Sequence, residues 1–279
     1  ISGGNSLSSF ANGATGLIVV NTAATTIDAS AFEGNVTLNA AAGGLNSFLT
    51  IKGGGLTTDT VTMAVNPTAG TADKIALMSG IETLTLTGVS DTANNAVDVT
   101  NVTGLVTLAP SMSVGQSHIA VEGLDEAVNV KVTSATTLDN VVLGLTGATG
   151  AANSLSVEMT ATGSVSTHTL NLDVAGLETL NIASKDTDGT AVDLAGMVPT
   201  TGSTGTVNIT GAGALTITAM DTGINVIDAS EATGAVSVAA AARDADLYTI
   251  TGGSANDTIA LENVGDILDG GAGTGDNLI

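Results

Sequence analysis

Glycine pairs and aspartates recur at a fixed spacing in residues 252–278 of this 279-residue chain. Residues 252–260 fit the nine-residue pattern Gly-Gly-x-Gly-x-Asp-x-apolar-x, with alanine in place of the third glycine. Residues 261–269 form a degenerate copy, and residues 270–278 form a third copy with one residue inserted before Asp276. Glycine-rich turns of this kind gather main-chain carbonyls and carboxylates between successive turns. Such an oxygen-rich gap suits Ca²⁺ better than the geometrically stricter Mg²⁺.

The predicted calcium ligands come from all three copies of the pattern. Asp257 and Asp266 lie nine residues apart, and the two glycine pairs lie eighteen apart, which is two repeat periods. Because stacked aspartates without a cation repel one another, we expect calcium binding and folding to be coupled. The predicted ligand set is Asn256, Asp257, Asp266, Asp269, Asp276, Gly252, Gly253, Gly265, Gly270, Gly271 and Gly273.

Short strands are the elements that must position these residues. Aliphatic residues alternate with Thr, Ser or Asn, which is the pattern of a half-buried strand, and no helical periodicity competes with it. Each calcium-binding turn is expected to end on an inward-pointing aliphatic residue, Ile259, Ile267 or Leu278. The clearest alternating segments are 36–38, 84–86, 128–130, 170–172, 207–209, 215–217 and 236–238.

Two longer motifs recur in the order first, second, second, first. Residues 27–38 return as residues 227–238, and the segment around Glu82 returns around Glu178. Paired carboxylates can serve a glycosidase, but these two glutamates occupy equivalent places in two repeats, which favours a shared structural role. The pattern also predicts that the chain is a fragment of a longer array that continues past Ile279.

Asp59 and Asp73 belong to upstream copies of the calcium pattern. The turn that contains Asp59 aligns with the turn that contains Asp257, but both upstream copies have lost most of the glycines. They are candidate metal ligands, and decayed structural turns are the preferred interpretation.

Stacked repeats predict an all-β fold. The preferred architecture is a right-handed parallel β-helix, or β-solenoid, over residues 1–250, with calcium-binding turns over residues 251–279. The alternative is a series of tandem β-sandwich modules with calcium turns at their junctions. The two differ in contact range, because solenoid contacts stay within adjacent turns.

Composition excludes several functions. The chain carries 27 acidic and 5 basic residues, a formal net charge of −22, so a surface that follows nucleic-acid phosphates or anionic lipid is not credible. No apolar run approaches the ~18 residues of a membrane helix. His118 and His168 lack metal-ligand spacing, and no nucleophile elbow supports a Ser-His-Asp triad, so no enzyme is predicted. Tyr248 is expected to fill the core or to cap it.

The nonapeptides resemble those of RTX (repeats-in-toxin) calcium-binding proteins, which are exported by type I secretion. The motifs at residues 176–183, 225–230 and 252–259 follow the order seen in bacterial S-layer proteins of the Caulobacter type. The Cys-free, Thr-, Ala- and Gly-rich composition is also typical of them. This resemblance implies a calcium-stiffened structural protein, secreted to the surface of a Gram-negative cell.

The same resemblance implies the partners of the chain. Further copies of the chain would assemble into a lattice, and any contact with cell-surface polysaccharide would be made by regions outside this chain. The alternative function is a repeat segment of a large RTX adhesin or of an extracellular matrix or filament protein.

Overall fold

The computed structural model separates into two compact units, Ile1–Leu124 (unit 1) and Asp125–Ile279 (unit 2). Each unit is described by itself. The boundary predicted near residue 250 stays a prediction. The structure describes residues 6–7, 16–20, 26–31, 35–40, 50–55, 57–64, 73–74, 77–87, 97–111, 118–134, 140–146, 152–161, 168–185, 189–200, 202–239, 247–260 and 264–279.

Unit 1 consists of three ladders of parallel strands. Successive strands of a ladder come from successive turns of the chain, so that Thr60 pairs with Thr83 and Thr83 pairs with Thr107. The first ladder is β2 (Gly16–Val20), β4 (Val36–Ala40), β6 (Thr60–Ala64), β9 (Thr83–Thr87) and β12 (Thr107–Ser111). The second is β1 (Ser6–Leu7), β3 (Thr26–Asp28), β5 (Thr50–Lys52), β8 (Met78–Ser79) and β11 (Val102–Thr103). The third is β7 (Asp73–Lys74), β10 (Val97–Asp98) and β13 (His118–Leu124).

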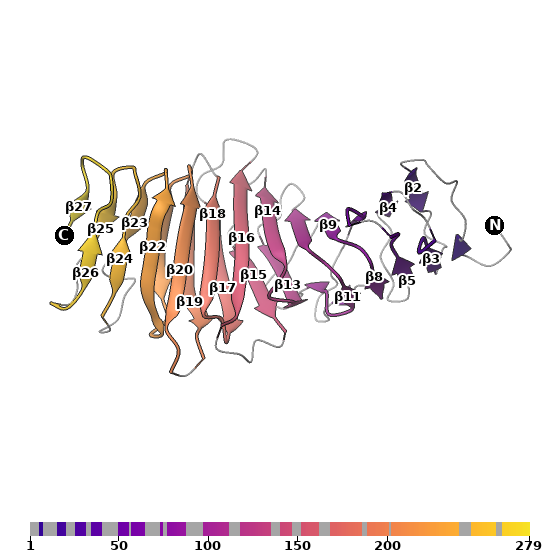
Figure 1. The fold of residues 1–279 in the computed structure, drawn as a ribbon, viewed down its shortest axis with the longest axis horizontal. Helices are drawn as coiled ribbons and strands as arrows, with labels where there is room; N and C mark the ends of the chain where they lie inside the picture. The colour runs from indigo at the N-terminus through magenta and orange to yellow at the C-terminus, as the bar shows by residue number, and fades with distance from the viewer. Residues whose placement is uncertain are drawn as a thin grey trace. The chain divides into compact units, whose positions relative to one another are not determined.

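Unit 2 has two long parallel ladders, whose strands lie side by side in Figure 1. The first ladder is β14 (Asn129–Ser134), β16 (Ser154–Ala161), β18 (Thr179–Ser184), β20 (Gly205–Gly211), β22 (Ile224–Ala232), β24 (Thr249–Thr251) and β26 (Ile267–Asp269). The second is β17 (His168–Ala175), β19 (Thr190–Val198), β21 (Leu215–Met220), β23 (Val236–Val238), β25 (Thr258–Ile259) and β27 (Asn277–Leu278). Strand β15 (Asn140–Leu145) packs next to β17.

The length of a turn changes within unit 2. Asn129 pairs with Ser156, 27 residues further on, whereas Thr249 pairs with Ile267, only 18 residues further on. The shorter turn equals two nonapeptides, one for each ladder. The calcium-type pattern therefore coincides with the shortest turns of the unit.

Parallel pairing between successive turns confirms the prediction of an all-β parallel β-solenoid. The β-sandwich alternative is wrong for the described strands, because a sandwich is built from antiparallel sheets and these ladders are parallel. The predicted alternating segments all fall within strands, apart from Val128, which precedes β14 by one residue. The described residues form no helix. Accordingly, no membrane-spanning helix is found among them.

The core of each unit is a stack of aliphatic residues in register. In unit 2, Leu155, Leu180 and Val207 lie opposite one another on successive strands, and none is exposed. Side chains on either side of them along each strand face outward and are mostly Thr, Ser or Asn. Tyr248 fills the core with 1% of its surface exposed, as predicted. Phe10, Phe32 and Phe48, expected to have the same role, lie outside the described residues.

One predicted core position is wrong. Ile259 is fully buried as expected, but Ile267 is 64% exposed. The adjacent Leu268 lies opposite the buried Ile250 and takes the inward position instead. Leu278 lies opposite Ile259, as predicted for an inward residue, yet is 48% exposed.

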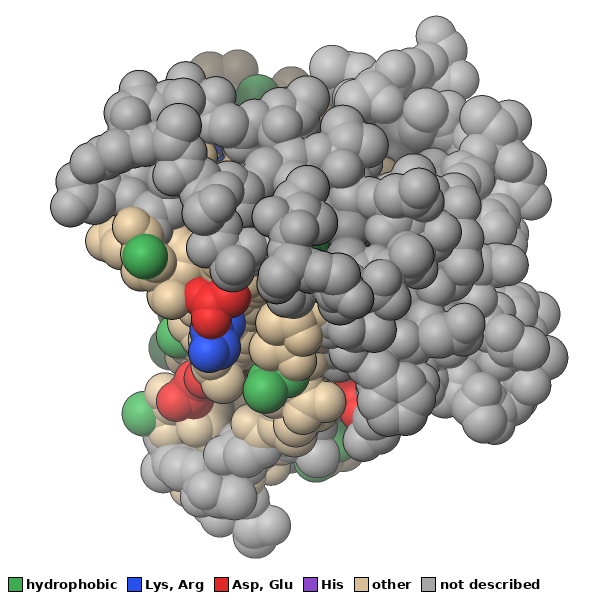
Figure 2. Space-filling model, turned by 90° about the vertical axis from the view of Figure 1, so that its right-hand side faces the viewer, with side chains coloured by type: hydrophobic (Ala, Val, Ile, Leu, Met, Phe, Trp, Pro, Cys, Tyr) green, Lys and Arg blue, Asp and Glu red, His purple; other side chains and the backbone are tan. Residues whose placement is uncertain are grey.

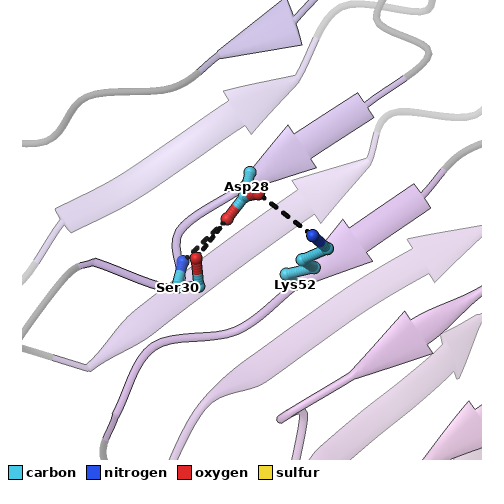
Figure 3. A network of polar contacts seen from close by, with 3 residues as sticks. All are labelled: Asp28, Ser30 and Lys52. Atoms are coloured by element: carbon cyan, nitrogen blue, oxygen red, sulfur yellow. Dashed lines mark hydrogen bonds and ion pairs between the residues drawn. The ribbon is translucent and has the colours of Figure 1, made fainter.

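The repeated Ile-Asp-Ala-Ser segments form the same turn in both units. Ser30 donates its N–H to Asp28 Oδ1 at 3.1 Å, and Ser230 donates its N–H to Asp228 Oδ1 at 3.0 Å. The Ser30 hydroxyl, its N–H and Lys52 hold the pKa of Asp28 below its ordinary value, and Ser230 lowers the pKa of Asp228 in the same way. Lys52 Nζ lies 3.3 Å from Asp28 Oδ2 (Figure 3). Basic and acidic side chains also lie together in the described part of the face drawn in Figure 2.

Thr190 tests how strictly the core of unit 2 excludes polar groups. Its hydroxyl is buried without a hydrogen-bond partner among the described residues. A buried unsatisfied polar group costs about 1–3 kcal/mol, so Thr190→Val is expected to raise the free energy of unfolding by about 1 kcal/mol. Urea unfolding followed by circular dichroism measures this. The half-exposed Thr179 of β18 gives the control, Thr179→Val, expected to change stability within about 0.5 kcal/mol. Destabilisation by Thr190→Val would contradict the prediction.

Candidate functional site

Six acidic residues share one position in the fold, immediately before a strand. In each case a carboxylate oxygen accepts the backbone N–H of the residue in register on the preceding turn, at 2.7–3.1 Å. We call them the strand-entry carboxylates: Asp59, Glu82, Glu178, Asp257, Asp266 and Asp276, which accept from Val36, Asp59, Asn153, Val236, Tyr248 and Asp257 respectively.

The hydrogen-bonding requirement of a parallel ladder explains this arrangement. A backbone N–H at the start of a strand is taken out of water before the ladder can supply a carbonyl partner, and a buried N–H without a partner is costly. A carboxylate forms shorter and stronger hydrogen bonds than a neutral acceptor. Asp59, Glu178 and Asp257 are only 0%, 4% and 1% exposed, so these bonds are also shielded from water.

Asp59 and Asp257 make the same pair of contacts. Besides the N–H of the preceding turn, the second oxygen of Asp59 accepts from Gly54 N–H at 2.5 Å, and that of Asp257 accepts from Gly253 N–H at 2.7 Å. The glycine before each donor is required, because a Cβ at Gly53 or Gly252 would lie 2.8 or 2.5 Å from the carboxylate. These contacts confirm the predicted alignment of the two turns. They also show a structural role for Asp59. The side chain of Asp73, in β7, lies outside the described residues.

Glu82 and Glu178 have the shared structural role predicted from their repeat. Glu82 Oε2 accepts from Asp59 N–H at 2.8 Å, and Glu178 Oε2 accepts from Asn153 N–H at 2.9 Å. The other oxygen of Glu178 accepts from Thr200 N–H at 2.9 Å. Burial acts to raise the pKa of Glu178, but the hydrogen bonds from Thr200 and Asn153 outweigh it and hold the pKa below its ordinary value.

The last four strands follow the nonapeptide spacing. Strands β24, β25, β26 and β27 begin at residues 249, 258, 267 and 277, so the steps are nine, nine and ten residues. The longer step contains the residue that the sequence places as an insertion before Asp276. Strands therefore alternate between the two ladders once per nonapeptide, and the glycine-rich segments form the turns between them.

Oxygen atoms converge in the gap between the turns that begin at Gly252 and Gly270. A Cβ placed on Gly252 would lie 2.4 Å from the Gly270 carbonyl oxygen and 2.5 Å from Asp257 Oδ2. A Cβ on Gly273 would lie 2.2 Å from the Ala255 carbonyl oxygen and 2.3 Å from Asp276 Oδ1. Carbonyls and carboxylates of consecutive turns therefore surround the places that only glycine leaves open.

The structure brings part of the predicted ligand set together. Asp257, Asp276 and the glycines at 252, 253, 270, 271 and 273 lie around this gap, where a Cβ on Gly271 would meet the carbonyl oxygens of Gly252 and Gly253. Asn256, at the exposed rim, accepts from Gly275 N–H at 3.1 Å. These contacts place the residues and leave their role as ligands a prediction.

Three predicted ligands lie elsewhere. Asp266 precedes β26, in the other ladder from Asp257 and Asp276. A Cβ on Gly265 would meet the side chain of Leu247. Asp269 is exposed at the end of β26, where it accepts from Gly271 N–H at 3.0 Å.

The chemistry of the gap is restricted to oxygen ligands. Among the described residues no three His, Cys, Asp or Glu side chains lie close enough together to hold a metal ion. A cation in the gap would therefore depend on main-chain carbonyls together with Asp257 and Asp276. Such a mixed set fits Ca²⁺, which takes six to eight oxygens in flexible geometry.

Sequence reasoning missed how the strand-entry carboxylates work, although a signal for them was present. Four of the six are followed by Thr and then an aliphatic residue: Asp59, Glu82, Glu178 and Asp257. An acidic residue directly before the alternating strand pattern thus marks the position. His118 and His168 begin β13 and β17, and their side chains lie outside the described residues.

Removing one charge tests the strand-entry bond without a cation. Asp59→Asn replaces an acceptor by an amide that directs N–H toward a backbone N–H, so we expect a loss of about 1–3 kcal/mol in the free energy of unfolding. Asp28→Asn is the control in the same unit, at an exposed turn, and should change stability by less than about 0.5 kcal/mol. Both are measured by urea unfolding in chelator. Equal stability of the two variants would contradict the structural role of Asp59.

The depressed pKa of Glu178 predicts an acid-dependent contribution to stability. Its ionised form is favoured in the folded state, so its contribution is complete above the ordinary glutamate pKa of about 4.3 and is lost as the pH falls through the lower folded pKa. The stability difference between the native chain and Glu178→Gln should therefore be largest near neutral pH and shrink below about pH 4. Urea unfolding at several pH values measures it. A difference that is constant with pH would disagree with this assignment.

No protein-family model matches the chain, and no curated protein or solved structure matches it either. Its fold therefore rests on the parallel ladders described above. The resemblance to RTX and S-layer proteins stays a prediction from the residues.

Proposed function

We propose that this chain is a structural segment of a self-assembling extracellular surface layer, and that Ca²⁺ bound between its short turns orders both fold and assembly. The observation that carries the proposal is the oxygen-lined gap between the turns at Gly252 and Gly270. The carboxylates of Asp257 and Asp276 and the carbonyls of the glycine pairs contribute to that gap. No catalytic role is part of the proposal.

Charge gives independent support for a bound cation. The chain has a net charge of −22, and five basic residues cannot neutralise it. Asp257 and Asp276 occupy the same register position on adjacent turns, where Asp276 accepts the N–H of Asp257 at 3.0 Å. Two carboxylates this close in a partly buried site repel each other, and a divalent cation between the turns would remove that repulsion. Binding would therefore stabilise the folded turns directly.

The solenoid architecture supports a structural role. Each turn is held by its neighbours, so repeats can extend a rigid scaffold without a new core for each unit. We include a right-handed coil in the proposal, because parallel crossover connections are right-handed in nearly all known cases. Secretion to a Gram-negative cell surface, and the RTX character of the turns, belong to the same proposal and rest on the resemblance of the motifs.

A calcium titration tests the metal part of the proposal. We expect Ca²⁺ at the ~10⁻⁴–10⁻³ M affinity of extracellular modules to increase the β signal in circular dichroism and the free energy of unfolding, and chelator to reverse both. Asp257→Asn and Asp276→Asn should weaken the calcium response. Asp276 lies nearer the surface than Asp257, so its variant is the less prone to misfold.

The matched control is Asp228→Asn, an exposed turn aspartate of the same unit, which should keep the full calcium response. Unchanged calcium dependence in Asp276→Asn would contradict a site in this gap. Electron microscopy then tests assembly: ordered sheets in calcium that dissolve in chelator support the surface layer. Monodisperse monomers at every calcium concentration would overturn that part of the proposal and favour the adhesin alternative.

A further inference from the structure

A hollow of about 200 Å³ opens on the outer face of unit 2, across strands β14, β16, β18 and β20 (Figure 1). The outward residues of these strands form rows in register. In one row Asn129, Ser156 and Asn181 lie opposite one another, and in the next row Lys131, Glu158 and Ala183 do so. The hollow has a simple cause: the short side chains of Ser156 and Ala183 stand between longer ones.

Hydrogen bonds fix the amides along the first row. Asn208 donates its Nδ2–H to Asn181 Oδ1 at 2.8 Å, and Asn181 donates its Nδ2–H to Ser156 Oγ at 3.4 Å. These side chains are held in place before any ligand arrives, so binding would cost them little conformational entropy. Their remaining lone pairs and N–H or O–H groups offer both donors and acceptors to a ligand.

Two of the five basic residues of the chain stand at this hollow. Lys131 is exposed and lies in register with Glu158. The Glu158 carboxylate is held at 2.8 Å by Lys185 from the residue that follows β18. The local charge is therefore positive on a strongly acidic chain, and Lys131 is placed to meet an anionic group.

We propose that this hollow binds a sugar chain that carries carboxylate groups. Sugar hydroxyls both donate and accept hydrogen bonds, as the fixed amides and Ser156 require. Parallel strands repeat the same groups every 4.7–4.9 Å, close to the length of one pyranose ring. Lys131 would bind the carboxylate. None of the large apolar side chains that the described residues expose lines the hollow, which disfavours a protein partner with apolar anchors.

The proposal is independent of the calcium turns. The hollow is built by residues 129–210, and no member of the predicted calcium ligand set lines it. Loss of sugar binding should therefore leave the calcium titration unchanged, so the two proposals can fail separately.

Isothermal titration of the full chain with a hyaluronan hexasaccharide tests the site, with the same hexasaccharide reduced at its carboxylates as the neutral control. We expect the acidic sugar to bind and the reduced sugar to bind more weakly. Ala183→Leu fills the hollow and should weaken binding about tenfold or more. Ala109→Leu is the matched control, because Ala109 faces outward from β12 in the other unit at similar exposure. Lys131→Gln should abolish the preference for the acidic sugar.

Circular dichroism of each variant shows whether the fold is kept. Absence of binding by the folded native chain, equal binding of the acidic and reduced sugars, or full binding by folded Ala183→Leu would each overturn the proposal.

Discussion

The constraint on which the described fold depends is the backbone N–H that enters each parallel strand. In a solenoid of short strands this group is buried repeatedly, once for each strand of each turn, and each instance needs an acceptor. At six such positions the acceptor is a carboxylate from the following turn, three of which are almost fully buried. Acidic residues are thus part of the packing between turns. The net charge of −22 is in part a consequence of how the turns are joined.

The same interaction relates the two proposals for the short turns. Where the carboxylate is single and well supplied with donors, as at Asp59, backbone N–H groups satisfy it and the turn needs no ion. Where glycines also admit carbonyl oxygens into the gap, as around Asp257 and Asp276, the same carboxylates face further oxygens. A calcium turn and a structural turn therefore differ mainly in whether small residues let main-chain oxygens approach.

Much of the fold follows from local pattern. Alternation in segments such as 207–209 predicts strands because side-chain direction in a strand has a period of two. The nonapeptide spacing predicts where the last four strands begin. The wrong inward residue at Ile267 shows the limit, because Ile267 and Leu268 are both apolar and only their pairing with Thr249 and Ile250 decides between them. The donors to the carboxylates were out of reach for the same reason, since register between turns 18–25 residues apart cannot be read from one strand.

The shortening of the turns in unit 2, from 27 residues to 18, has a mechanical consequence. A shorter turn encloses fewer apolar side chains, and in a repeat protein stability is a sum of such local contributions. The 18-residue turns are then the weakest links of the unit, and local opening begins there. An ion held between them acts where the least free energy is needed to decide whether the coil stays wound.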